Sequence, residues 1–97
     1  MHARVVRFTG GDADSIARNV EVIKERSASG PPEGVPAVGA KFLADDASGT
    51  FIAISFYETE EDMRTGDATL NEMSPEEPMG TRASVDLCEV KHEVQAP

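Results

Sequence analysis

The feature that most constrains the fold is a short apolar run at residues 51–57, FIAISFY. It is too short for a helix that buries one face, and its β-branched and aromatic residues favour a strand. Because large apolar groups alternate onto both faces, we predict that both faces of this strand are buried. The rest of the chain supplies two candidate helices, enough to cover one face of a sheet. We therefore expect a second copy of the protein to cover the other face. The sequence does not decide which alternating set of side chains meets the partner: Phe51, Ala53, Ser55 and Tyr57, or Ile52, Ile54 and Phe56.

The other elements are arranged around this strand in a simple order. The pattern predicts strands at 3–8, 38–44, 51–57 and 83–94, and helices at 13–27 and from 59. In the first helix, Ile16, Val20 and Ile23 fall at helical spacing and form one apolar stripe. The order βαββαβ predicts a single domain over residues 1–97 with an α+β, ferredoxin-like fold. Its four-stranded antiparallel sheet would have the first and third strands in the middle, where both faces are apolar.

The second helix carries both a start signal and an interruption. Thr59, with an acidic residue three positions later, is typical of a capping box. Gly66 costs about 1 kcal/mol relative to Ala inside a helix. We therefore predict a break there, with Asp67 capping a second piece. Pro75 and Pro78 are predicted to end the helix.

Composition excludes several partners and compartments. The formal net charge of −9 disfavours nucleic acid and anionic membranes, because a phosphate surface requires neutralising Lys and Arg. The single cysteine, Cys88, rules out an internal disulfide and fits a reducing cytoplasm. We expect Cys88 to be a small buried core residue. No signal peptide and no membrane-spanning segment are predicted, so the expected location is the cytoplasm.

Several segments carry a resemblance to a known group. They are MHARV at 1–5, the turn and strand at 45–57, YETEEDMR at 57–64, GDATLNEM at 66–73 and SVDLCEV at 84–90. In these segments the chain resembles the small dimeric α/β-barrel proteins related to antibiotic-biosynthesis monooxygenases, in particular short uncharacterised actinobacterial members. The resemblance implies a homodimer in which two sheets face each other to form a barrel. It also implies a cleft between the sheet and the helices of each protomer.

The activities of that group differ among its members. Some oxidise aromatic or quinol substrates without a cofactor, others degrade haem, and many have no known reaction. The haem-degrading and quinone-forming members use a Trp, and this chain contains none. The missing Trp therefore argues against haem degradation and weakens the assignment of a quinone-forming activity, and we expect that no cofactor is needed.

A few polar side chains are predicted to point into an apolar cleft, which is the usual composition of a small-molecule site. The polar candidates are Tyr57, Asn71, Arg7 and Ser55. The predicted apolar lining is Phe8, Phe56, Leu70 and Met73. The alternative is that Tyr57 caps the core and the apolar residues are plain packing.

The two histidines are a further candidate pair. The first and last strands are expected to be antiparallel, so His2 and His92 are predicted to be neighbours in space. Two imidazoles can bind a metal or relay a proton, but no third ligand accompanies them. We therefore expect no metal site, and His92 enters only as a second candidate proton acceptor at the cleft.

Two functional classes follow from these residues. The first is a cofactor-independent monooxygenase acting on a small aromatic or polyketide-like compound, with Tyr57 or His92 accepting the proton. The second is a non-catalytic dimer that binds a small apolar ligand or serves as an accessory partner. An open apolar cavity with convergent polar groups would favour the enzyme, and a filled cleft would favour the second class.

Overall fold

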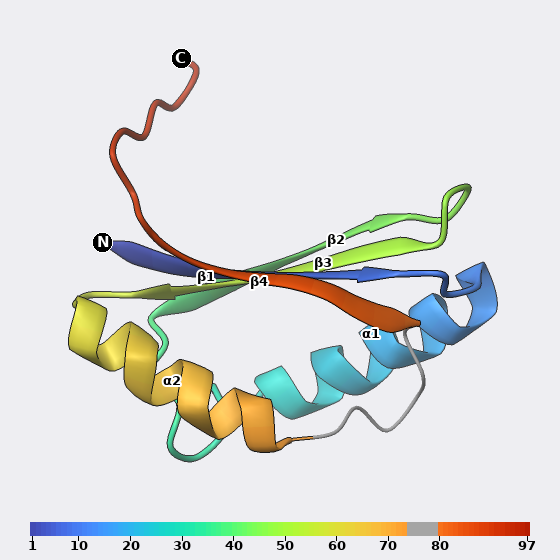
Figure 1. The fold of residues 1–97 in the computed structure, drawn as a ribbon, viewed down its shortest axis with the longest axis horizontal. Helices are drawn as coiled ribbons and strands as arrows, with labels where there is room; N and C mark the ends of the chain where they lie inside the picture. The colour runs from blue at the N-terminus through green and yellow to red at the C-terminus, as the bar shows by residue number, and fades with distance from the viewer. Residues whose placement is uncertain (74–79) are drawn as a thin grey trace.

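The fold is a single antiparallel sheet with two helices packed on one side (Figure 1). The structure is a computed structural model that describes residues 1–73 and 80–97. Its elements are β1 (His2–Thr9), α1 (Ala13–Ser27), β2 (Gly39–Asp45), β3 (Thr50–Tyr57), α2 (Glu60–Glu72) and β4 (Thr81–Glu89). The strand order is β2-β3-β1-β4, and every neighbouring pair is antiparallel. The expected small α+β architecture is confirmed, with β1 and β3 in the centre, and it is compatible with a ferredoxin-like fold.

Both helices begin at capped residues. Asp12 precedes α1, and its Oδ1 accepts a hydrogen bond of 2.8 Å from the backbone N–H of Ser15. This bond, with a second from the Ser15 hydroxyl, lowers the pKa of Asp12. At α2, the Oγ1 of Thr59 accepts a bond of 3.0 Å from the N–H of Asp62, as its capping-box pattern predicts.

The predicted break of α2 at Gly66 is wrong. The helix runs without interruption from Glu60 to Glu72. Gly66 is buried, and a Cβ placed on it would lie 2.6 Å from both Cε1 and the hydroxyl oxygen of Tyr57. The missing side chain lets the helix backbone approach the tyrosine ring, and this contact outweighs the low helix propensity of glycine. Pro75 and Pro78 lie outside the described residues.

The last strand is shorter than predicted, ending at Glu89 instead of Val94. In the last backbone hydrogen bond between the two segments, the N–H of Val90 donates to the carbonyl oxygen of Met1 at 2.9 Å. The pairing of β4 with β1 ends with this bond, one residue beyond the His2–Glu89 pair. The following residues leave the sheet on the side opposite the helices (Figure 1).

The alternation of side chains along β3 is now assigned to faces. Phe51 packs with Ile16 of α1, and Tyr57 packs with Met63 of α2. Because successive side chains of a strand point to opposite faces, Ile52, Ile54 and Phe56 occupy the face away from the helices. Phe56 therefore does not line a cleft under the helices, contrary to the prediction. Of the two alternating sets, the one that a partner can contact is therefore Ile52, Ile54 and Phe56.

That second face of the sheet has no helix over it, and we call it the uncovered face. Strand pairing places these apolar residues on it: Val5, Leu43, Ile52, Ile54 and Phe56. Leu43 is 48% exposed. Cys88, which pairs with Ala3 on β1, also lies on this face and is exposed. The expectation of a buried Cys88 is wrong, because no second layer covers its side of the sheet.

Candidate functional site

Tyr57 and Ser55 lie together between β3 and α2. Tyr57 is fully buried, with 0% of its surface exposed. Its hydroxyl oxygen lies 2.9 Å from that of Ser55, so the two groups share a hydrogen bond. Met63 and Gly66 of α2 close over the ring. Side chains therefore fill the space under this half of α2.

Asn71 lies on the last turn of α2 and contacts arginines instead of Tyr57. Its Oδ1 accepts a bond of 3.1 Å from Nη2 of Arg4 and one of 2.8 Å from Nη1 of Arg82. The Nε of Arg4 also donates to Oδ1 of Asp67 at 2.8 Å, which forms an ion pair. The residue Arg4 is only 6% exposed. We call these four residues, Arg4, Asp67, Asn71 and Arg82, the arginine cluster.

Local geometry explains how three elements bring this cluster together. Asp67 and Asn71 are four residues apart and so project from one side of α2. On β1, Arg4 alternates with Val5 and therefore faces the helices. Sequence reasoning selected Arg7 and missed Arg4. Phe8 is four residues after Arg4 on the same strand, so both side chains point to the same face. Because Phe8 packs against the core under α1, Arg4 also lies on the helix side.

Arg82 reaches the cluster through an irregularity in β4. Arg7 pairs with Ser84, but the next residue, Phe8, pairs with Arg82, so Ala83 is an extra residue in β4. Such a bulge shifts which side chains point to each face. It turns Arg82 to the face shared with Phe8, where Asn71 accepts its hydrogen bond. Nothing in the local sequence marks this bulge.

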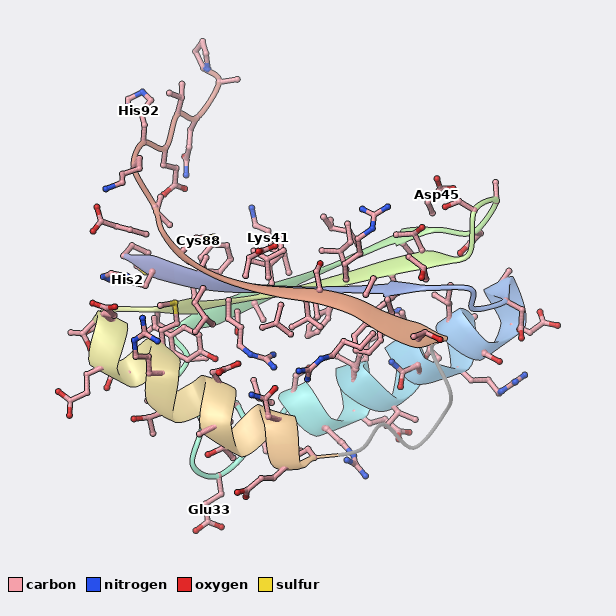
Figure 2. The ribbon with its side chains drawn as sticks, in the orientation of Figure 1. His2, Glu33, Lys41, Asp45, Cys88 and His92 are labelled. Carbon is pink, nitrogen blue, oxygen red and sulfur yellow. The ribbon has the colours of Figure 1, made fainter. Side chains whose placement is uncertain are left out.

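Arg7 and His92 lie apart from the other candidates. Arg7 is exposed and alternates with the helix-facing residues of β1, so it belongs to the uncovered face. His92 lies on the segment that follows β4 (Figure 2). The partner of His2 on β4 is Glu89, and the chain has turned away from the sheet before it reaches His92. The predicted proximity of His2 and His92 is therefore wrong.

Glu89, at the end of β4, has a charged partner of its own. Lys91 donates to its Oε1 at 2.8 Å. This hydrogen bond and the opposite charges lower the pKa of Glu89 and raise the pKa of Lys91. Both side chains are exposed, so this pair is a surface feature with little effect on stability.

Surface hollows lie beside α2, formed by described residues of the helix and of the loop before β2. One is lined by Glu60, Glu61, Arg64, Thr65 and Ala68. The other is lined by Gly34, Val35, Pro36, Asp62 and Thr65. Both are open depressions, and neither is lined by any of the five predicted pocket residues. Among residues 1–73 and 80–97, no three His, Cys, Asp or Glu side chains are grouped to hold a metal ion.

Comparisons with models of protein families, with curated proteins and with solved structures each gave no significant match. In the described part of the chain, no helix has the length and apolar character needed to span a bilayer. The uncovered face, the filled space around Tyr57 and the arginine cluster are the features of the molecule that bear on its function.

Proposed function

We propose that the protein is a homodimer closed sheet on sheet into an α/β barrel, and that it binds a small aromatic or polyketide-like molecule without catalysing its oxidation. The uncovered apolar face would form the dimer interface, and it is the observation that supports this proposal. Cross-strand pairing puts Val5 beside Ile54, and Leu43 beside Ile52, so the apolar side chains are contiguous over three strands. A contiguous apolar surface of this kind on a small protein marks an interface. Two such sheets pack about 10 Å apart with their side chains interdigitated.

Charges at the edges of the uncovered face favour a second copy as its occupant. Lys41 on β2 pairs with Ile54, and Asp86 on β4 pairs with Val5, so both charges share this face. β2 and β4 are the two opposite edges of the sheet. A two-fold axis parallel to the strands places β2 of one copy over β4 of the other. Lys41 then faces Asp86 of the second copy, twice in the dimer.

The segment after β4 supports the same assembly. It extends on the uncovered side of the sheet (Figure 1), and its Val94 is 74% exposed. A segment in that position can lie against a second copy seated on the sheet. Val94 would then gain cover that its own chain does not provide.

Light scattering tests the dimer and should give about twice the chain mass of 10.4 kDa. Ile54→Glu should break the dimer, because the interface would bury an unpaired charge. Ala17→Glu is the matched control, since it adds the same charge at an exposed position of α1. A wild-type monomer at micromolar concentration would refute the assembly, as would an Ile54→Glu variant that stays dimeric.

The filled space under α2 favours binding over catalysis. The monooxygenase alternative needs Tyr57 or His92 to accept a proton from a substrate. The Tyr57 hydroxyl is buried and bonded to Ser55, and His92 lies outside the fold on the segment after β4. Oxygen uptake with a panel of quinols should therefore stay at the buffer rate. Turnover that Tyr57→Phe abolishes would instead establish the enzyme.

A further inference from the structure

We infer that the arginine cluster binds the carboxylate of a small organic acid, with one guanidinium on each side of it. This deepens the proposed function and rests on it, because it names the chemical class of the small molecule. The relevant groups are Arg4 on β1, Arg82 on β4, and Asp67 and Asn71 on α2.

The first observation is the convergence of two cations on one neutral atom. Arg4 and Arg82 both donate to Oδ1 of Asn71, at 3.1 and 2.8 Å. Two guanidinium groups that share an acceptor repel each other. Asp67 is the cluster's only carboxylate, and it pairs with Arg4, so one positive charge is in excess. Among the described residues, Arg82 has only the neutral oxygen of Asn71 as a partner.

The second observation is the bulge that brings Arg82 to this place. Without the bulge, regular alternation along β4 would direct the methyl group of Ala83 to the helix side and Arg82 to the uncovered face. Bulges interrupt strand pairing, and they recur next to functional sites where they redirect a side chain. Here the redirected side chain is the second arginine of the cluster.

The third observation is the difference in burial between the two arginines. The Arg4 side chain is 7% exposed and is held by Asp67, so its guanidinium is fixed before a ligand arrives. Arg82 and Asn71 are exposed, which leaves an approach from solvent. A carboxylate that takes the place of the Asn71 oxygen gains two charge-assisted partners, and the planar fork of arginine matches its geometry.

The ligand's charge and body follow from the surroundings. A monoanion balances the single excess positive charge, whereas a phosphate dianion would overcompensate it. Met73, two residues beyond Asn71, is 45% exposed and offers a flexible apolar surface to an aromatic body. The expected ligand is therefore an aromatic or polyketide-like carboxylic acid.

NMR titration with 2-naphthoate and its uncharged analogue 2-naphthamide tests this inference. Naphthoate should shift the side-chain signals of Asn71 and Arg82 and bind at least about 10-fold more tightly than the amide. Arg82→Gln should remove that preference, because naphthoate loses one of its two charged partners. Arg64→Gln is the matched control, because Arg64 is an exposed arginine of α2 bonded to Glu60.

The outcomes separate this inference from the proposed function. Equal binding of acid and amide would refute the carboxylate site while small-molecule binding stands. Naphthoate binding that Arg82→Gln leaves unchanged would refute the site in the same way. If neither compound shifts any signal, the inference and the binding half of the proposed function both fail.

Discussion

Gly66→Ala tests whether the space under α2 is filled. At an exposed position in a helix this change would stabilise the protein by about 1 kcal/mol. At Gly66 the new methyl group would lie 2.6 Å from Cε1 and the hydroxyl oxygen of Tyr57, and 2.8 Å from Cζ. Normal carbon contacts are about 3.5–4.0 Å. Because Tyr57 is 0% exposed, its ring cannot swing into solvent.

The magnitude follows from three opposing effects. Overpacking a core position costs about 1–3 kcal/mol. Displacing the tyrosine also strains its hydrogen bond to Ser55, which is worth about 1 kcal/mol. The gain in helix propensity offsets about 1 kcal/mol of this. We expect Gly66→Ala to lower the free energy of unfolding by roughly 1–3 kcal/mol.

Urea denaturation followed by circular dichroism, at one fixed protein concentration, measures this change. Ala68→Gly is the control, because Ala68 is exposed on the same helix and should lose about 1 kcal/mol from propensity alone. In a Tyr57→Phe background the cost of Gly66→Ala should shrink, since one of the two closest atoms is gone. A Gly66→Ala variant as stable as wild type would refute the reasoning. It would mean that the ring can move and that a cavity can open beneath α2.

Three further predictions concern the cluster, the first helix and metals. Asn71→Asp supplies a carboxylate between the two arginines, so it should raise the melting temperature and abolish naphthoate binding; a lower melting temperature would contradict the charge excess. The pKa of Asp12 is lowered in the folded state, so its stabilising effect is present above the ordinary value of 3.8 and is lost as pH falls through the folded pKa. Asp12→Asn should therefore flatten the loss of stability on acidification below about pH 4, measured by urea titrations at several pH values. Metal analysis of untagged protein should find no stoichiometric transition metal, and haemin should give no sharp Soret shift; either signal at one per chain would overturn the expectation that no cofactor is needed.

The sequence predicts the order of the elements better than the faces of the strands. Apolar residues on both faces correctly place β1 and β3 in the centre of the sheet. The same symmetry hides which face meets the helices, because Phe51 and Phe56 are equally apolar and have opposite parity. Packing against the helices, such as that of Phe51 against Ile16, decides between them. The sequence does not tell which of Arg4 and Arg7 faces the helices for the same reason, since Val5 and Val6 are identical residues on opposite faces.

The remaining errors arise where tertiary contacts override local preference. Gly66 looks like a helix break when the helix is considered alone, yet its lack of a side chain is what the Tyr57 ring requires. Cys88 has the apolar neighbours of a core residue, but its strand has cover on one side only. The bulge at Ala83 depends on the pairing between β1 and β4, and no turn residue signals it.

The proposed interface and the proposed acid site use opposite faces of the same strands. On β1, Arg4 faces α2 while its neighbour Val5 faces the uncovered side. On β4, the bulge brings Arg82 to the helix side while Asp86 stays on the uncovered face. Because the sheet is one layer thick, a substitution on either face can leave the other face intact. Arg82→Gln should therefore weaken naphthoate binding while the light-scattering mass stays at the dimer value. A loss of both together would mean that Arg82 supports the sheet itself and is not a ligand contact.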